Sequence, residues 1–159
     1  TDDLIAALAR AGVWVIPTLT CYRNPVQAGL PKTFIKKIGM QGMDFVELHA
    51  RQARRMLDGG ARLAGGADGV QVGVGPADIA DEAAYLGEMA GSADFGLRAV
   101  TDLAAQALGL ADRGIIAAGK RADLLLLAEN PLRDMRALRR VTQVYQGGRP
   151  ALQAGAPLI

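Results

Sequence analysis

The sequence predicts an α/β fold over residues 1–110 and a small β-rich segment over residues 111–159. Three observations predict it. The first 65 residues give helix, glycine and strand in that order twice, which is the rhythm of an alternating α/β protein. Apolar residues then recur at helical spacing as far as Leu108. The last third instead contains short apolar or alternating runs between turn residues, which are typical of strands.

The first repeat begins with a helix whose start and end are both marked. Asp2 and Asp3 precede an apolar run and are placed to accept from the N–H groups of the first turn, and Gly12 ends the helix. Val13–Leu19 is apolar and β-branched, which predicts a strand buried on both faces. Pro17 cannot donate to a neighbouring strand, so it should lie near the end of this one.

The second repeat is predicted as a helix over Met43–Leu57 and a short buried strand over Ala61–Gly65. The small residues at 64–67 allow backbone or a ligand to approach closely. Thr20–Gly42 lies between the two repeats and is expected to be irregular, with a short helix at Lys32–Ile38. An insertion at this place covers an active site in many α/β proteins, but a plain surface excursion explains it equally well.

Two more helices, a further strand and a hairpin are expected after a glycine-broken loop at Val70–Pro76. The ranges of the remaining predicted elements are Ala77–Ala90 and Ser92–Leu108 for the helices, and Leu124–Leu127, Val141–Gln146 and Arg149–Gln153 for the strands. The leucine run predicts a strand buried on both sides, whereas the alternation in the next strand predicts half exposure. Gly147 and Gly148 would make the turn of the hairpin.

Composition excludes several classes of function. The 18 basic and 16 acidic residues are intermixed, so nothing points to nucleic acid or to an acidic membrane surface as a partner. No apolar run reaches the length of a membrane span. Cys21 is the only cysteine, which rules out an internal disulfide and suits a reducing compartment, so we expect a cytoplasmic protein. Nothing pairs Cys21 with the only histidine, His49, and we expect structural roles for both.

Asp68 is the one residue whose position in the sequence suggests a catalytic role. It follows directly after a buried strand that ends in small residues, which is where parallel α/β proteins place catalytic groups. The alternative is a turn or helix-capping residue, because Asp-Gly is a common turn pair. Spacing alone favours the turn. The glycines at 65, 66 and 69 do not form a dinucleotide-binding fingerprint, and a phosphate-binding GK[ST] motif is absent.

A resemblance changes this balance. Residues 107–132 read ALGLADRGIIAAGKRADLLLLAENPL, with Thr101 and Ala104–Ala105 upstream. This pattern resembles the C-terminal signature of the metal-dependent amidohydrolases, in particular their imidazolonepropionase-like and prolidase-like branch. Val13–Leu19 is similar to the strand that follows a Leu-Ala-x-Ala-Gly helix in that family. Residues 66–68, Gly-Ala-Asp, lie where the family usually carries Gly-Thr-Asp at the end of the last barrel strand.

The resemblance implies a (β/α)8 TIM barrel with a composite β-sandwich domain. This chain would supply the last strands and helices of the barrel in residues 1–110 and the C-terminal sandwich strands in residues 111–159. It also implies that Asp68 binds or adjoins a divalent metal, zinc by expectation, and acts as general base on the metal-bound water. Such a carboxylate takes a proton from the water and passes it to the leaving nitrogen.

The chain departs from the family pattern in its metal ligands. The family's His-x-His pair, lysine and two further histidines are not in the sequence, His49 is in the wrong place to substitute, and Ala67 replaces the usual threonine. One carboxylate does not hold a catalytic zinc, which takes three protein ligands. The chain also begins at Thr1 without methionine. We therefore expect the C-terminal portion of a longer enzyme, inactive and metal-free on its own.

The resemblance implies hydrolysis of a carbon–nitrogen bond in an amide, a cyclic amide or an Xaa-Pro dipeptide. The partners would be that small molecule, the missing N-terminal part of the barrel and possible further copies of the chain. Tyr22 and Arg23 are the candidate substrate contacts if Thr20–Gly42 lines a pocket. The first alternative is a non-catalytic relative or a module that completes another chain's barrel. A weaker alternative is an independent α/β binding domain that uses the same loop for recognition.

Overall fold

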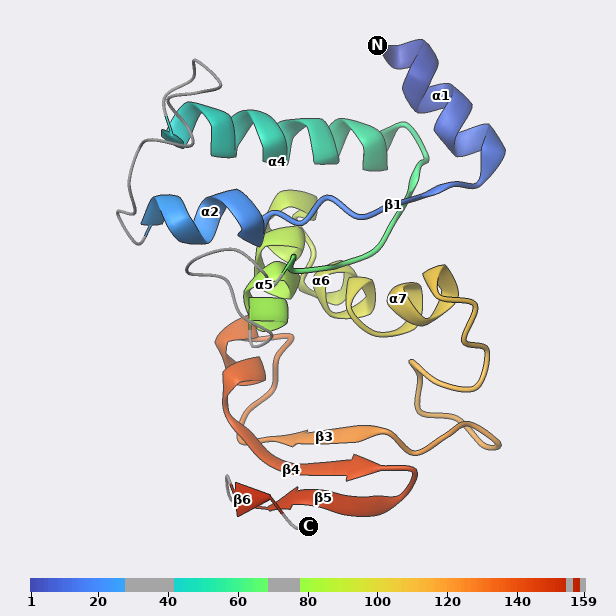
Figure 1. Cartoon of the computed structure of the whole chain (residues 1–159), viewed down its shortest axis with the longest axis vertical. Coiled ribbons are helices and arrows are strands. Elements are labelled where there is room, and N and C mark those ends of the chain that lie inside the picture. The colour runs from blue at the N-terminus through green and yellow to red at the C-terminus, as the bar shows by residue number, and fades with distance from the viewer. Residues whose placement is uncertain (28–41, 69–77, 154–155, 158–159) are drawn as a thin grey trace.

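The structure is a computed structural model that describes residues 1–27, 42–68, 78–153 and 156–157. Helices and a short parallel strand pair form one part of the molecule, and an antiparallel sheet forms the other (Figure 1). The predicted helix at 32–38 and the predicted loop at 70–76 lie outside the described residues. None of the described helices is both long enough and apolar enough to cross a membrane.

The first repeat has the predicted order of elements. Helix α1 covers Asp2–Ala11 and ends at Gly12, whose φ of 63° is the left-handed conformation of a helix stop. Strand β1 covers Trp14–Val15. Helix α2, Thr20–Gln27, then replaces the irregular chain that we expected at the start of Thr20–Gly42. The prediction of irregular structure is therefore wrong for these eight residues.

The second repeat is helix α4, Gly42–Asp58, followed by strand β2, Arg62–Leu63. The two strands pair in parallel, with Trp14 opposite Arg62 and Val15 opposite Leu63. The helix, glycine and strand order therefore predicted the topology correctly.

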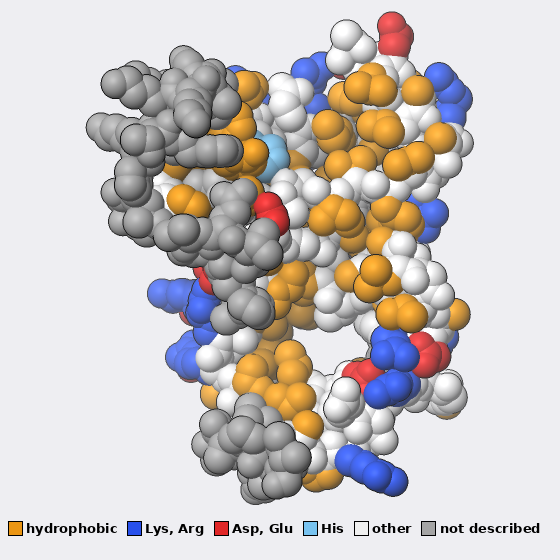
Figure 2. Space-filling model, in the orientation of Figure 1, with side chains coloured by type: hydrophobic (Ala, Val, Ile, Leu, Met, Phe, Trp, Pro, Cys, Tyr) orange, Lys and Arg blue, Asp and Glu red, His pale blue; other side chains and the backbone are white. Residues whose placement is uncertain are grey.

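The prediction that Val13–Leu19 is a strand buried on both faces is wrong, whereas the predicted burial of the strand over Ala61–Gly65 is confirmed at Ala61, Leu63 and Ala64. Val13 and Ile16, which flank β1, are 46% and 44% exposed. Leu63 is buried, but Arg62 is exposed and places its guanidinium 4.1 Å from the centre of the Trp14 ring. In the described part of the chain the parallel sheet has two strands, so each strand has a neighbour on one edge only. Figure 2 shows hydrophobic side chains exposed on the face that carries α1.

Three helices follow, and they differ from the prediction in one respect. Helix α5 covers Ile79–Ala90, while the expected second helix is divided into α6, Ala93–Ala99, and α7, Asp102–Ala107. The break has a physical reason. The carbonyl of Ala99 accepts a hydrogen bond of 2.8 Å from the backbone N–H of Gly65, so it is engaged outside the helix.

The core lies where α2, α4, α5 and α6 meet. Its buried members share small or aliphatic side chains, and partly buried residues surround them: Leu19, Ala53, Leu86 and Ala99 inside, with Ala50, Tyr85, Met89 and Phe95 packed against them. This core fixes the start of α2 relative to α5. The position of the candidate site depends on that relation.

The sheet of the C-terminal part has the order β3-β4-β5-β6, with bounds Leu124–Leu127, Val141–Gln146, Arg149–Gln153 and Ala156–Pro157. The predicted hairpin is confirmed, and its turn residues Gly147 and Gly148 have φ of 57° and 80°. The prediction that the leucine strand is buried on both sides is wrong. Leu125 and Leu126 are 56% and 43% exposed, because β3 pairs with a neighbour but is not covered by a second layer of described residues.

A short 3₁₀ helix, η2, joins the sheet to the helical part. It covers Met135–Arg139, and its Ala137 is fully buried. Arg139 forms an ion pair of 2.6 Å with Asp81 on α5 and a second one of 3.3 Å with Asp78. The two parts of the chain therefore touch through η2 and α5. The predicted domain boundary after residue 110 stays a prediction.

Candidate active site

Asp68 lies on the segment that leaves the carboxyl end of β2. The parallel pairing places this segment beside the one that leaves β1. Two contacts show this directly. The Thr20 hydroxyl lies 3.4 Å from the Ala67 carbonyl, and the Cys21 thiol donates to Oδ2 of Asp68 with a sulfur–oxygen distance of 3.6 Å. Asp68 itself is exposed. An exposed carboxylate thus stands at the carboxyl edge of a parallel strand pair, as the sequence predicted.

The backbone on this edge adopts uncommon conformations. Among the described residues, Thr18 and Asp68 are the non-glycine residues with positive φ, at 51° and 44°. Aspartate tolerates this region, whereas a β-branched threonine rarely adopts it. Thr18 lies on the segment that leaves β1 and Asp68 on the segment that leaves β2, so both lie beyond the carboxyl ends of the two parallel strands. Backbone strain concentrated in this way is common at functional sites.

The small residues before Asp68 are required by close packing of the protein itself. A Cβ added at Gly65 would lie 2.7 Å from Cγ1 of Val100, and one added at Gly66 would lie 2.7 Å from Cγ2 of Ile16. The predicted close approach of backbone is confirmed at Gly65, whose N–H donates to the Ala99 carbonyl at 2.8 Å.

A second carboxylate, that of Glu82, binds the backbone at the start of α2. Glu82 on α5 is fully buried, and its Oε1 and Oε2 accept hydrogen bonds of 3.0 and 2.9 Å from the backbone N–H groups of Leu19 and Thr20. These N–H groups lie at the start of α2, where a helix provides no partners of its own. Burial raises the pKa of Glu82, and the hydrogen bonds from Thr20 and Leu19 oppose that shift.

The environment of Cys21 keeps its thiol protonated. The side chain is 4% exposed, and burial raises its pKa to about 11, with further upward contributions from the hydrogen bond to Asp68 and from the charges of Asp68 and Glu82. A thiol with this pKa is a poor nucleophile at neutral pH. His49 lies on α4, and its ring packs edge-on against Tyr22 at 5.2 Å between ring centres. Both residues have the structural surroundings that we expected.

We expect Cys21 to resist alkylation in the folded protein. A pKa near 11 instead of 9.0 leaves about 100-fold fewer thiolates at pH 8. The measurement is the rate at which iodoacetamide labels the Cys21 peptide at pH 8, followed by mass spectrometry in buffer and in concentrated urea. Labelling at least 100-fold slower in buffer is the expected result. Equal rates in the two solvents would contradict the burial of the Cys21 thiol.

Tyr22 and Arg23 both make contacts that pack α2 against other helices. The Tyr22 ring lies 4.5 Å from the Phe45 ring on α4. Arg23 pairs with Glu88 on α5 at 2.9 Å and stacks over the Tyr85 ring at 4.1 Å. These contacts explain both side chains without a ligand, and their predicted role as substrate contacts stays a prediction.

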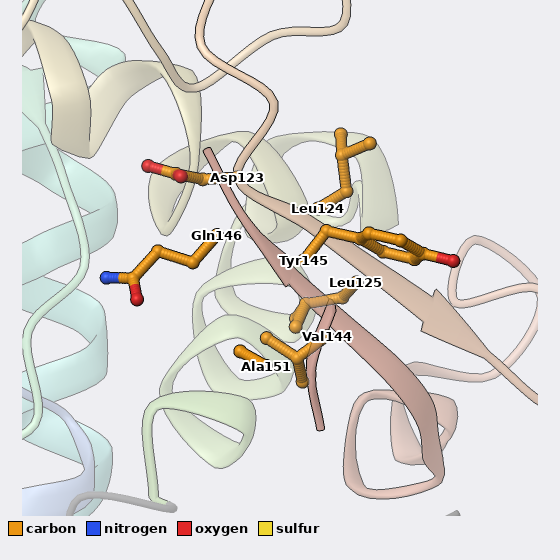
Figure 3. Close-up of a pocket in the computed structure, with 7 residues that line it drawn as sticks. All are labelled: Asp123, Leu124, Leu125, Val144, Tyr145, Gln146 and Ala151. Atoms are coloured by element: carbon orange, nitrogen blue, oxygen red, sulfur yellow. The ribbon is translucent and has the colours of Figure 1, made fainter. Parts of the chain in front are cut away.

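The pocket of Figure 3 lies on the antiparallel sheet and is lined by Asp123, Leu124, Leu125, Val144, Tyr145, Gln146 and Ala151. Its one carboxylate is already engaged. Asp123 accepts from the Gly147 N–H and from Arg121, and these interactions lower its pKa. The lining offers no further charged group, so we do not place chemistry there.

Residues 2–151 match the amidohydrolase family. The chain belongs to that family. This confirms the resemblance that the pattern over 107–132 indicated. No curated protein sequence matches the chain.

Solved structures have similar folds. The chain is similar to a putative prolidase from Bifidobacterium longum, with a TM-score of 0.81 and 28% identity, covering 100% of the chain and 41% of that protein. It resembles the fold of a prolidase complexed with N-methylphosphonate-L-proline, with a TM-score of 0.77, 23% identity and coverage of 96% and 38%.

A third similar fold is that of an adenosine deaminase from Xanthomonas campestris with bound zinc, with a TM-score of 0.65, 24% identity and coverage of 99% and 36%. The chain therefore spans 36% to 41% of the length of these three structures.

Sequence reasoning missed the structural part played by Glu82. We expected an α5 helix over Ala77–Ala90 without assigning this residue a buried partner. The available signal is its place on the helix, because Glu82 is in line with Ile79, Ala83 and Leu86 at helical spacing. A carboxylate in an apolar stripe is buried only when it is paired or hydrogen-bonded.

Proposed function

We propose that this chain provides a catalytic carboxylate, Asp68, to a hydrolase that acts on carbon–nitrogen bonds within a (β/α)8 barrel. The observation that carries the proposal is the exposed Asp68 at the carboxyl edge of the parallel pair β1–β2, beside Thr18 with its uncommon positive φ on the neighbouring segment. Catalytic groups of parallel α/β barrels come from this edge. Membership of the amidohydrolase family supports the reaction class.

Asp68 would act as general base and then as general acid. Its carboxylate takes a proton from the attacking water while the water oxygen bonds to the carbonyl carbon of the substrate. When the carbon–nitrogen bond breaks, the same carboxyl group gives this proton to the leaving nitrogen. The Cys21 thiol donates to Oδ2 and so holds one oxygen of the carboxylate in place.

A divalent metal, zinc, is proposed for the whole enzyme. Among the described residues there is no group of three or more His, Cys, Asp or Glu side chains able to hold a metal ion. The described part alone therefore does not fit a metal, and the proton steps above are assigned to Asp68 alone. A similar fold described with bound zinc supports the choice of metal. The ligands other than Asp68 would come from residues outside the described part.

The proposed substrate is an Xaa-Pro dipeptide or a related small amide. The putative prolidase at 28% identity supports this class, and a prolidase bound to N-methylphosphonate-L-proline has the same fold. Tyr22 and Arg23 remain proposed contacts for it, on the segment that follows β1. The non-catalytic alternative keeps one supporting observation, namely that Ala67 occupies the position of the family's usual threonine.

The test combines metal analysis with an activity assay. Both use the proposed longer protein that contains this chain, called the intact enzyme below. Elemental analysis is expected to find stoichiometric zinc in the intact enzyme and none in the 159-residue chain, and the intact enzyme is expected to hydrolyse alanyl-proline. Zinc without hydrolysis of this dipeptide would exclude the dipeptide and leave other amides to be assayed. An intact protein with neither zinc nor hydrolysis of amides would support the non-catalytic alternative.

A further inference from the structure

Glu82 is a buried charge that the proposed reaction does not use. It is fully buried on α5, and both of its oxygens are occupied by backbone N–H groups of Leu19 and Thr20. The donors are 62 and 63 residues away in sequence. Leaving a carboxylate without partners at such a depth is costly, so the start of α2 and the side chain of Glu82 hold each other in place.

The first turn of α2 continues this chain of contacts to the candidate site. Thr20 is also fully buried, and its hydroxyl lies 3.4 Å from the carbonyl of Ala67. Cys21 is the next residue and donates to Oδ2 of Asp68. Hydrogen bonds therefore connect Glu82 to the first turn of α2, and the first turn of α2 to the segment that follows β2.

We propose that Glu82 is a positioning residue, which fixes the first turn of α2 and through Thr20 and Cys21 fixes the Asp68 carboxylate. This inference rests on the proposed function, since it gives Asp68 a role that needs precise placement. A general base displaced by about 1 Å loses much of its effect, on the order of 100-fold.

The first test is Glu82→Gln in the intact enzyme, with Glu129→Gln as the matched control. Glutamine keeps one acceptor oxygen and turns an NH₂ group toward a backbone N–H. Glu129 is exposed and pairs with Arg140 near the sheet, away from this chain of contacts. With alanyl-proline as substrate, we expect kcat to fall between 10-fold and 100-fold in Glu82→Gln, with KM within about twofold. The control should keep both values.

A second readout does not depend on activity. The side-chain carboxyl ¹³C resonance of Asp68 should shift in Glu82→Gln and not in Glu129→Gln, and amide exchange at Thr20 should become faster. Faster exchange with an unchanged Asp68 resonance and unchanged kcat would show that Glu82 only caps the helix, and would overturn the proposal. If the wild-type enzyme hydrolyses no amide, the proposed function fails, and the Asp68 resonance still decides on positioning.

If Glu82→Gln does not fold, two Thr20 variants test the positioning proposal instead. Thr20→Val keeps the two backbone N–H donors to Glu82 and removes the hydroxyl, which contacts both Glu82 and the Ala67 carbonyl, whereas Thr20→Ser keeps that hydroxyl. We expect a lower kcat and a shifted Asp68 resonance in Thr20→Val, with both restored in Thr20→Ser. Wild-type values in Thr20→Val would overturn the chain of contacts.

Discussion

Replacing Asp68 with asparagine is expected to lower kcat of the intact enzyme by about 1000-fold or more. A positioned general base contributes roughly 100-fold to 10,000-fold, and an amide does not accept the proton. Asparagine has almost the same shape and also tolerates the positive φ of 44° found at this position. Asp68 is exposed, so we expect little change in stability. The measurement is kcat for alanyl-proline together with the thermal unfolding midpoint.

Asp58→Asn is the matched control for this substitution. Asp58 ends α4, is exposed, and forms an ion pair of 2.8 Å with Arg54, so its loss removes only a solvent-screened surface interaction. We expect near wild-type kcat in this variant. Near-normal turnover in Asp68→Asn would remove Asp68 from the mechanism. A large fall in both variants would indicate a general effect of lost negative charge.

Much of the fold could be predicted because local signals and tertiary structure agree. Gly12 ends α1 where expected, and the pair Gly147-Gly148 makes the hairpin that alternation in β4 indicated. Burial was predicted less well. An apolar run such as Leu124–Leu127 indicates a strand but does not say how many layers cover it, because covering layers are contributed by distant segments.

In the candidate site, too, local features could be predicted and contacts between distant segments could not. The position of Asp68 after β2 could be predicted because it is a local property of the sequence, and its catalytic role stays a prediction. Helix α2 could not, because Pro25 lies inside it and the stabilising cap comes from Glu82 on another helix. The break between α6 and α7 depends likewise on Gly65, which uses the Ala99 carbonyl. Interactions over such separations have no periodic signature in the sequence.

Replacing Gly96 with alanine is expected to be strongly destabilising, by about 3 kcal/mol. In the interior of α6 this change would normally stabilise the helix by up to about 1 kcal/mol. Here an added Cβ would collide with the carbonyl oxygen of Ala83 and lie 2.8 and 2.9 Å from the backbone N and Cα of Gly87. All three atoms belong to the backbone of α5, so no rotation of a side chain relieves the contact and the helices must separate.

Two glycine variants separate this steric effect from other causes. At Gly87, on the facing helix, an added Cβ meets its nearest neighbour, the Ser92 carbonyl oxygen, at 3.3 Å, so Gly87→Ala should cost clearly less. Gly91→Ala meets nothing within 4 Å but carries a φ of 67°, which costs about 1 kcal/mol. Urea unfolding followed by circular dichroism gives the three free energies. Equal losses at all three positions would contradict close backbone packing of α5 against α6. The largest loss of unfolding free energy should therefore occur in Gly96→Ala. The same variant should also disturb the candidate site, because Ala83 adjoins Glu82 and a shift of α5 moves the Glu82 carboxylate away from the N–H groups at the start of α2.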